Sequence, residues 1–135
     1  MQRTSFSRSF AAIIGAAVLV SATAAFAFEA KPYDEASFKA AQAAGKHTVV
    51  HVTAPWCPTC KAQEKVIDGL AQKPDFKDVT LFKVDYDSQK DALKAFKVNT
   101  QSTLIAFNGA TETGRVVGDT TAGALAGVFS ASMKQ

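Results

Sequence analysis

The sequence has few of the residues that build metal sites. Its 135 residues include only two cysteines and two histidines. There is one CxxC pair and no second one, and His47 and His51 lie just upstream without the ligand spacing of a zinc finger. The chain also lacks internal repeats, low-complexity stretches and long linkers. These absences argue against a zinc-finger array or a repeat protein and favour one small folded domain.

The first residues have the three parts of a secretory signal. Arg3 and Arg8 make the beginning positive, Ala11 to Val20 is an apolar run, and Ala25-Phe26-Ala27 fits the A-x-A cleavage pattern. The alternative is a membrane anchor, but the strongly apolar run is short against the span of about 20 residues that a bilayer requires. We therefore expect residues 1–27 to be a cleaved signal peptide, residues 28–135 to be the mature domain, and the protein to be periplasmic or otherwise exported.

The chain lacks a large excess of charge of one sign. It has 15 basic and 12 acidic residues, and two of the basic ones, Arg3 and Arg8, belong to the predicted signal peptide. Without them the balance is close to neutral, so nothing in the composition indicates a nucleic-acid partner.

The two cysteines form a single motif, Trp56-Cys57-Pro58-Thr59-Cys60-Lys61. The β-branched run Thr48 to Thr53 precedes it, and the helix-like stretch Lys61 to Leu70 follows it. Two thiols at this spacing on the first turn of a helix can close into a disulfide with little backbone movement. The pair is therefore a candidate redox centre.

The position of Cys57 favours its reactivity. The first N–H groups of a helix lack intrahelical acceptors, and the helix dipole adds partial positive charge there. We therefore expect the pKa of the Cys57 thiol to fall below the free value of about 8.5, with Lys61 adding a nearby positive charge. Pro58 suits the first helical turn. Cys60 lies deeper in the helix, so Cys57 is the predicted attacking thiol and Cys60 the resolving thiol.

Two other roles for the pair stay open. A structural disulfide across so short a loop would constrain the unfolded chain little, because that effect grows with loop length. The pair could also supply two ligands of a metal site that a partner completes.

Hydrophobic periodicity predicts the other elements. The first predicted helix is Tyr33–Ala44, with Asp34 as N-cap and Gly45 as the stop. The second follows the motif and ends near Ala71-Gln72. The last two are Ser88–Lys97 and Thr120–Lys134. The predicted strands are Thr48–Thr53, Val79–Asp85, Thr103–Phe107 and, after an Asn108-Gly109 turn, Glu112–Val117. This order indicates a three-layer α/β domain, with a central mixed β-sheet and helices on both faces. The cysteines would lie at the C-terminal end of a parallel strand, where active sites gather.

Three blocks in this order resemble the thioredoxin family: Trp56-Cys57-x-x-Cys60-Lys61, Lys83 to Asp87, and Thr103 to Gly109. The resemblance implies the thioredoxin-like fold and dithiol–disulfide exchange without a cofactor. Cys57 would attack a partner disulfide, and Cys60 would resolve the mixed disulfide. Trp56 would shape the exposed rim or simply pack, and the dipeptide Pro58-Thr59 would tune the reduction potential.

Two positions depart from the family pattern. His51 stands where thioredoxins have a buried Asp that helps proton transfer at the resolving cysteine, and Lys83 resembles the lysine often found beside it. His51 could act as a base or be a neutral core residue bonded to backbone. Ser102 stands where the family has a cis-proline facing the cysteines. Because a cis bond before a non-proline residue costs roughly 2.5–4 kcal/mol, we expect a trans Gln101–Ser102 bond, with a hydroxyl near Cys57.

The sequence thus leads to one main hypothesis and two others. The main one is an exported thiol–disulfide oxidoreductase, a monomer that reduces disulfides in partner proteins and exchanges electrons with a membrane donor or oxidant. The second is a metal-binding or metallochaperone module that uses Cys57 and Cys60. The third is a docking scaffold, which would keep its function after Cys57→Ser.

Overall fold

The apolar run before the cysteines forms the central strand of a five-stranded sheet. In the computed structural model, which describes residues 27–134, β2 (His47–Thr53) pairs in parallel with β3 (Val79–Asp85) and antiparallel with β4 (Thr103–Asn108). A parallel edge strand, β1 (Glu29–Pro32), and an antiparallel one, β5 (Thr111–Val117), complete the order β1-β3-β2-β4-β5. The mixed sheet agrees with the sequence prediction.

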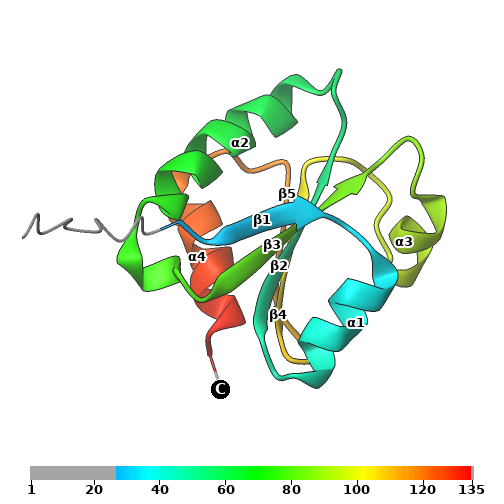
Figure 1. The fold of residues 1–135 in the computed structure, drawn as a ribbon. Helices are drawn as coiled ribbons and strands as arrows, with labels where there is room; N and C mark the ends of the chain where they lie inside the picture. Colours follow the sequence, from blue (N-terminus) through cyan, green and yellow to red (C-terminus); the bar gives the residue numbers. More distant parts are fainter. Residues whose placement is uncertain (1–26, 135) are drawn as a thin grey trace, which may run out of the picture.

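Helices cover both faces of this sheet (Figure 1). α2 (Pro58–Ala71) and α4 (Ala122–Ser132) pack on one face, and α1 (Glu35–Ala43) and α3 (Lys90–Ala95) pack on the other. A single 3₁₀ turn, η1 (Pro74–Phe76), follows α2. The predicted three-layer α/β architecture is therefore confirmed.

The alternation of side chains along β2 decides which residues reach the active-site helix. Val49 belongs to the core shared with α2 and α4, whereas Val50 and Val52 belong to the core shared with α1 and α3. Because neighbouring residues of a strand point to opposite faces, His51 lies on the same face as Val49. The strand therefore directs this one buried imidazole toward α2, where the cysteines begin the helix.

The helix boundaries follow the predicted signals at α1 and α2 but not at α3 and α4. The Asp34 carboxylate accepts a hydrogen bond from Ser37 N at the start of α1, and Gly45 has a left-handed φ of +68° just after its end. Three predicted helices were too long, because α1 begins after its cap at Asp34 and both α3 and α4 are shorter at each end. Before α3, the Asp85 carboxylate binds the backbone N–H and hydroxyl of Ser88 in a turn, so Ser88 does not enter the helix.

The strand β1 is not predicted from the sequence. The predicted order begins with a helix, but Glu29 to Pro32 forms an edge strand in register with Thr80 to Lys83 of β3. These four residues have no alternating apolar pattern, and three of them are exposed. Backbone pairing with β3 creates this strand, and a hydrophobic pattern cannot reveal such pairing.

The predicted signal peptide, Met1 to Ala27, lies outside the described residues apart from Ala27. Within residues 27–134, none of the helices has the length and apolar character that crossing a bilayer demands.

Candidate active site

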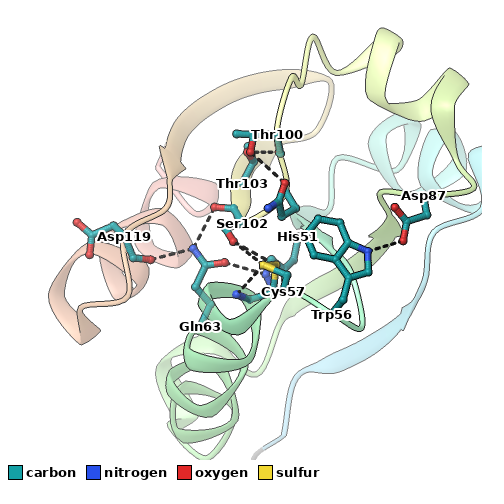
Figure 2. The surroundings of a disulfide bond; sticks show 11 residues. His51, Trp56, Cys57, Gln63, Asp87, Thr100, Ser102, Thr103 and Asp119 are labelled. Atoms are coloured by element: carbon teal, nitrogen blue, oxygen red, sulfur yellow. Dashed lines mark hydrogen bonds between the residues drawn. A yellow bond between two sulfur atoms is a disulfide. The ribbon is translucent and has the colours of Figure 1, made fainter.

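The two cysteines form a disulfide at the N-terminus of α2 (Figure 2). Cys57 is the N-cap residue, and its Sγ accepts a hydrogen bond of 3.1 Å from the backbone N–H of Cys60. Pro58 occupies the start of the helix, as its fixed φ and missing N–H predict. Helix N-cap positions stabilise negative charge through such N–H groups and the helix dipole. After reduction, this site therefore favours a thiolate at Cys57.

The two cysteines are almost equally buried. Cys57 is 1% exposed and Cys60 is 0% exposed, so the deeper position of Cys60 in the helix gives it hardly more shielding than Cys57 has. Both pack with Ala54, and Tyr86 lies against this cluster. The prediction that Cys57 attacks first therefore rests on its N-cap position and not on accessibility.

The exposed residue beside the disulfide is Trp56. Its side chain is 57% exposed, and its indole N–H donates a hydrogen bond of 2.8 Å to the Asp87 carboxylate. The ring meets that of Tyr86 edge to face, with the centroids 6.5 Å apart. Asp87 and Tyr86 thus hold a large, exposed aromatic surface at the rim of the site.

Ser102 reaches both sulfur atoms. Its Oγ lies 3.1 Å from Cys57 Sγ and 3.1 Å from Cys60 Sγ. The residue is buried, the peptide bond before it is trans as predicted, and its φ is +60°. This left-handed conformation is uncommon for a residue other than glycine. The predicted hydroxyl near Cys57 is therefore present, and it also contacts Cys60.

Gln63 is a residue of the site that the sequence pattern does not predict. It lies on α2, fully buried, between three neighbours. Its amide nitrogen donates to the carbonyl oxygens of Ser102 (3.0 Å) and Asp119 (2.8 Å), and its Oε1 faces His51 Nε2 at 3.0 Å. A buried amide with every group bonded fixes the relative positions of the elements that it joins. Gln63 therefore ties β2 and the loops before β4 and α4 to the active-site helix.

The contacts of Gln63 determine the tautomer of His51. Because the Gln63 amide nitrogen already donates to two carbonyl groups, its oxygen faces the imidazole, and Nε2 of His51 must carry the proton. His51 Nδ1 is then a lone-pair acceptor, and it is buried without a hydrogen-bond partner among the described residues.

Burial lowers the pKa of His51 from 6.5 to about 4, although the Gln63 hydrogen bond and the charge of Glu64 act in the opposite direction. The imidazole is therefore neutral near pH 7. Its hydrogen bond goes to a side chain and not, as one alternative expected, to the backbone. A role as a base for Cys60 stays a prediction, because in this disulfide state the imidazole binds Gln63.

The two lysines of the predicted site line a common groove. Lys83 is opposite His51 in the register of β2 and β3, and its Nζ lies 3.5 Å from a carboxylate oxygen of Glu64 on α2. Lys61 and Lys83 both line this groove of about 390 Å³, together with Ala54 and other residues. Thr59 is partly buried on the first turn of α2. The structure thus brings Lys61 and Lys83 to one side of the motif, and Ser102 and His51 to its buried side.

The metal-binding alternative gains no further ligands from the fold. In the part of the chain that the structure describes, no three His, Cys, Asp or Glu side chains are grouped so that they could hold a metal ion. Cys57 and Cys60 would supply two sulfur ligands, and a partner would have to complete the site.

Comparisons with known proteins agree with this geometry. The family model described as Thioredoxin matches residues 29–131. A thioredoxin H-type of Fagopyrum esculentum is 35% identical over 81 residues, which is 60% of this chain and 68% of that protein. A thioredoxin H2-1 of Oryza sativa subsp. japonica is 34% identical over 73 residues, which is 54% of this chain and 51% of that protein. The crystal structure of Trxlp from Edwardsiella tarda superposes with a TM-score of 0.71 at 42% identity, covering 73% of this chain and 96% of that one.

Proposed function

This chain belongs to the thioredoxin family of thiol–disulfide oxidoreductases, and we propose that it is an exported reductant of disulfides in partner proteins. The observation that carries the proposal is the disulfide at the N-cap of α2, with the exposed Trp56 beside it. This arrangement combines a stabilised Cys57 thiolate, a second thiol within reach and a surface for docking.

The reaction consists of two exchanges. The Cys57 thiolate attacks one sulfur of the partner disulfide, forms a mixed disulfide and releases the other partner sulfur as a thiolate. Cys60, after losing its proton, then attacks Cys57 Sγ, closes the Cys57–Cys60 disulfide and releases the second partner sulfur, which takes up a proton. The partner gains two electrons, and this chain loses them. An electron donor must therefore return two electrons to the chain for each cycle, and for an exported chain we expect this donor to lie in the membrane.

Two features favour the reducing direction. The motif reads Trp-Cys-x-x-Cys-Lys, as in the reducing thioredoxins that the chain resembles. The connection from β3 to β4 contains only the short helix α3 within the described residues, so no helical module is inserted there. Export is supported by the signal-peptide pattern of residues 1–27.

The proposal predicts where the chain is found and in which redox state. Cells that make the full chain are fractionated, quenched with acid and treated with an alkylating reagent that adds mass to each free thiol. We expect the protein in the exported fraction, shortened by about the length of residues 1–27, with Cys57 and Cys60 mostly as thiols. A chain without residues 1–27 is the matched control, and it should remain in the cytoplasm.

Two outcomes would contradict the proposal separately. A full-length chain that stays in the cytoplasm would overturn export, because the signal pattern would then not act. An exported chain that is mostly in the disulfide form would overturn the reducing direction and indicate an oxidant.

A further inference from the structure

We propose that the hydroxyl of Ser102 is a proton bridge between the two active-site sulfurs and therefore a catalytic group. In the dithiol state it donates its hydrogen to the Cys57 thiolate and accepts the hydrogen of the Cys60 thiol. This inference rests on thiol–disulfide exchange at Cys57 and Cys60, and it holds for either direction of electron flow and for any location of the protein.

The geometry brings one oxygen atom to both sulfurs. Ser102 Oγ lies 3.1 Å from each Sγ, and all three residues are buried. In the disulfide state neither sulfur carries a hydrogen, so the hydroxyl can only donate, and one sulfur at a time receives its single hydrogen. In the dithiol state with Cys57 ionised, the same oxygen has a donor on one side and an acceptor on the other. The hydroxyl therefore makes more hydrogen bonds in the reduced state than in the oxidised state.

The backbone of Ser102 is held in the conformation that this contact requires. Its N–H donates to Val52 O at 2.9 Å, and its carbonyl oxygen accepts from Gly118 N at 2.8 Å and from Gln63 Nε2 at 3.0 Å. These bonds join the residue to β2, to the end of β5 and to α2, and they hold a φ of +60° that a serine rarely adopts. Figure 2 shows Ser102 beside Cys57 and the Gln63 side chain reaching Ser102 from α2. The position of the hydroxyl is thus fixed by its neighbours, and Gln63 is a positioning residue for it.

No other side chain of the described residues makes a hydrogen bond to a cysteine sulfur. His51 occupies the position from which a base would be expected to act, but its Nε2–H binds Gln63. The side-chain bonds at Cys60 Sγ and Cys57 Sγ are those to Ser102 Oγ. The hydroxyl is therefore the group best placed to take a proton from Cys60.

The second exchange balances through this hydroxyl. Cys60 passes its proton to Ser102 Oγ, and Ser102 passes its own hydrogen to the partner sulfur that leaves Cys57. The Cys60–Cys57 bond forms as the bond from Cys57 to the partner sulfur breaks. Two electrons move from this chain to the partner, and one proton is relayed. No further oxidant or base is consumed.

Loss of the hydroxyl should weaken the reduced state. Ser102→Ala removes it, and Ser102→Gly removes it while allowing φ +60° without strain, so agreement of the two variants separates hydroxyl chemistry from folding. A hydrogen bond to an ionised group is stronger than one to a neutral sulfur. In titration of the purified full chain against glutathione, we expect reduction to become about tenfold less favourable in both variants. For this two-electron couple the change equals about 30 mV toward more negative potential.

A second measurement reports on the thiolate alone. The rate at which iodoacetamide alkylates the reduced chain, followed against pH, gives the pKa of Cys57. We expect this pKa to rise by about one unit in both variants, because a tenfold loss of thiolate stabilisation has that effect. The matched control is Thr100→Ala, which removes an exposed hydroxyl of the same loop that binds the Gln101 side chain and no sulfur. It should leave both quantities unchanged.

An unchanged equilibrium constant and an unchanged Cys57 pKa in Ser102→Gly would overturn the proton bridge. So would a change in Ser102→Ala that Ser102→Gly does not share, since backbone strain would then be the cause. Both measurements are made on the isolated protein, and neither outcome depends on whether the chain is exported or acts as a reductant.

Discussion

Replacing Cys60 with serine is expected to leave this chain covalently attached to its substrates through Cys57. The Cys57 thiolate can still attack a partner disulfide, but no second thiolate is present to displace the partner. Catalysed reduction of insulin by dithiothreitol should fall to the uncatalysed rate. The mixed disulfide should appear as an adduct on a non-reducing gel, and mass spectrometry should place it at Cys57. This result follows from the N-cap position of Cys57, whose Sγ receives the Cys60 N–H.

The matched control is Cys57→Ser, which keeps the other cysteine. It should give neither turnover nor adducts. Adducts that form through Cys60 in Cys57→Ser, and are absent in Cys60→Ser, would reverse the two roles. Function retained in Cys57→Ser would instead support the docking-scaffold hypothesis.

Acid is expected to destabilise the fold through His51. Burial lowers the pKa of this imidazole from 6.5 to about 4. Well above pH 6.5 His51 is neutral in both the folded and the unfolded chain, so it causes no pH dependence there. Between pH 6.5 and pH 4 the unfolded chain takes up a proton that the folded chain does not. The free energy of unfolding should therefore fall by about 3 kcal/mol across this range and change little below it on account of His51.

Urea unfolding at several pH values measures this effect. His51→Gln removes the titrating group but keeps an amide N–H for Gln63 Oε1. Between pH 6.5 and pH 4, the free energy of unfolding of this variant should therefore fall by about 3 kcal/mol less than that of the unsubstituted chain. The carboxylates are common to both proteins, so the difference between the two curves isolates the imidazole. His47→Gln is the matched control, because it removes the only other histidine. A pH dependence that disappears with His47 instead of His51 would contradict the assignment.

The sequence predicts the parts of this fold that depend on local pattern. The run from Thr48 to Thr53 is apolar and β-branched because β2 is buried on both faces, and Asp34 and Gly45 mark the ends of α1 through capping and a left-handed turn. β1 was missed because its four residues carry no such pattern. Its hydrogen bonds come from the edge of β3, which lies about fifty residues away in the sequence.

The active site likewise has features that the sequence predicts and features that only the structure shows. The spacing of Cys57 and Cys60 predicts their position on α2, and the resemblance to thioredoxin places Ser102 nearby. The contact of one hydroxyl with both sulfurs depends on the φ of Ser102 and on three hydrogen bonds that join the Ser102 backbone to distant elements, one of them from the Gln63 side chain. In the sequence, nothing distinguishes Gln63 from an ordinary polar residue of an amphipathic helix. Only the packed structure shows that it is buried between His51, Ser102 and Asp119.

The reduction potential of the Cys57–Cys60 couple tests the central claim most directly. The purified metal-free protein is equilibrated with dithiothreitol or glutathione buffers, alkylated, and weighed to count its free thiols. We predict a reversible two-electron couple whose potential is closer to the value of about −270 mV of a reducing thioredoxin than to about −120 mV. A value near −120 mV would contradict the reducing direction. If no disulfide forms and breaks reversibly, the pair is not a redox centre, and metal binding becomes the better account of this site.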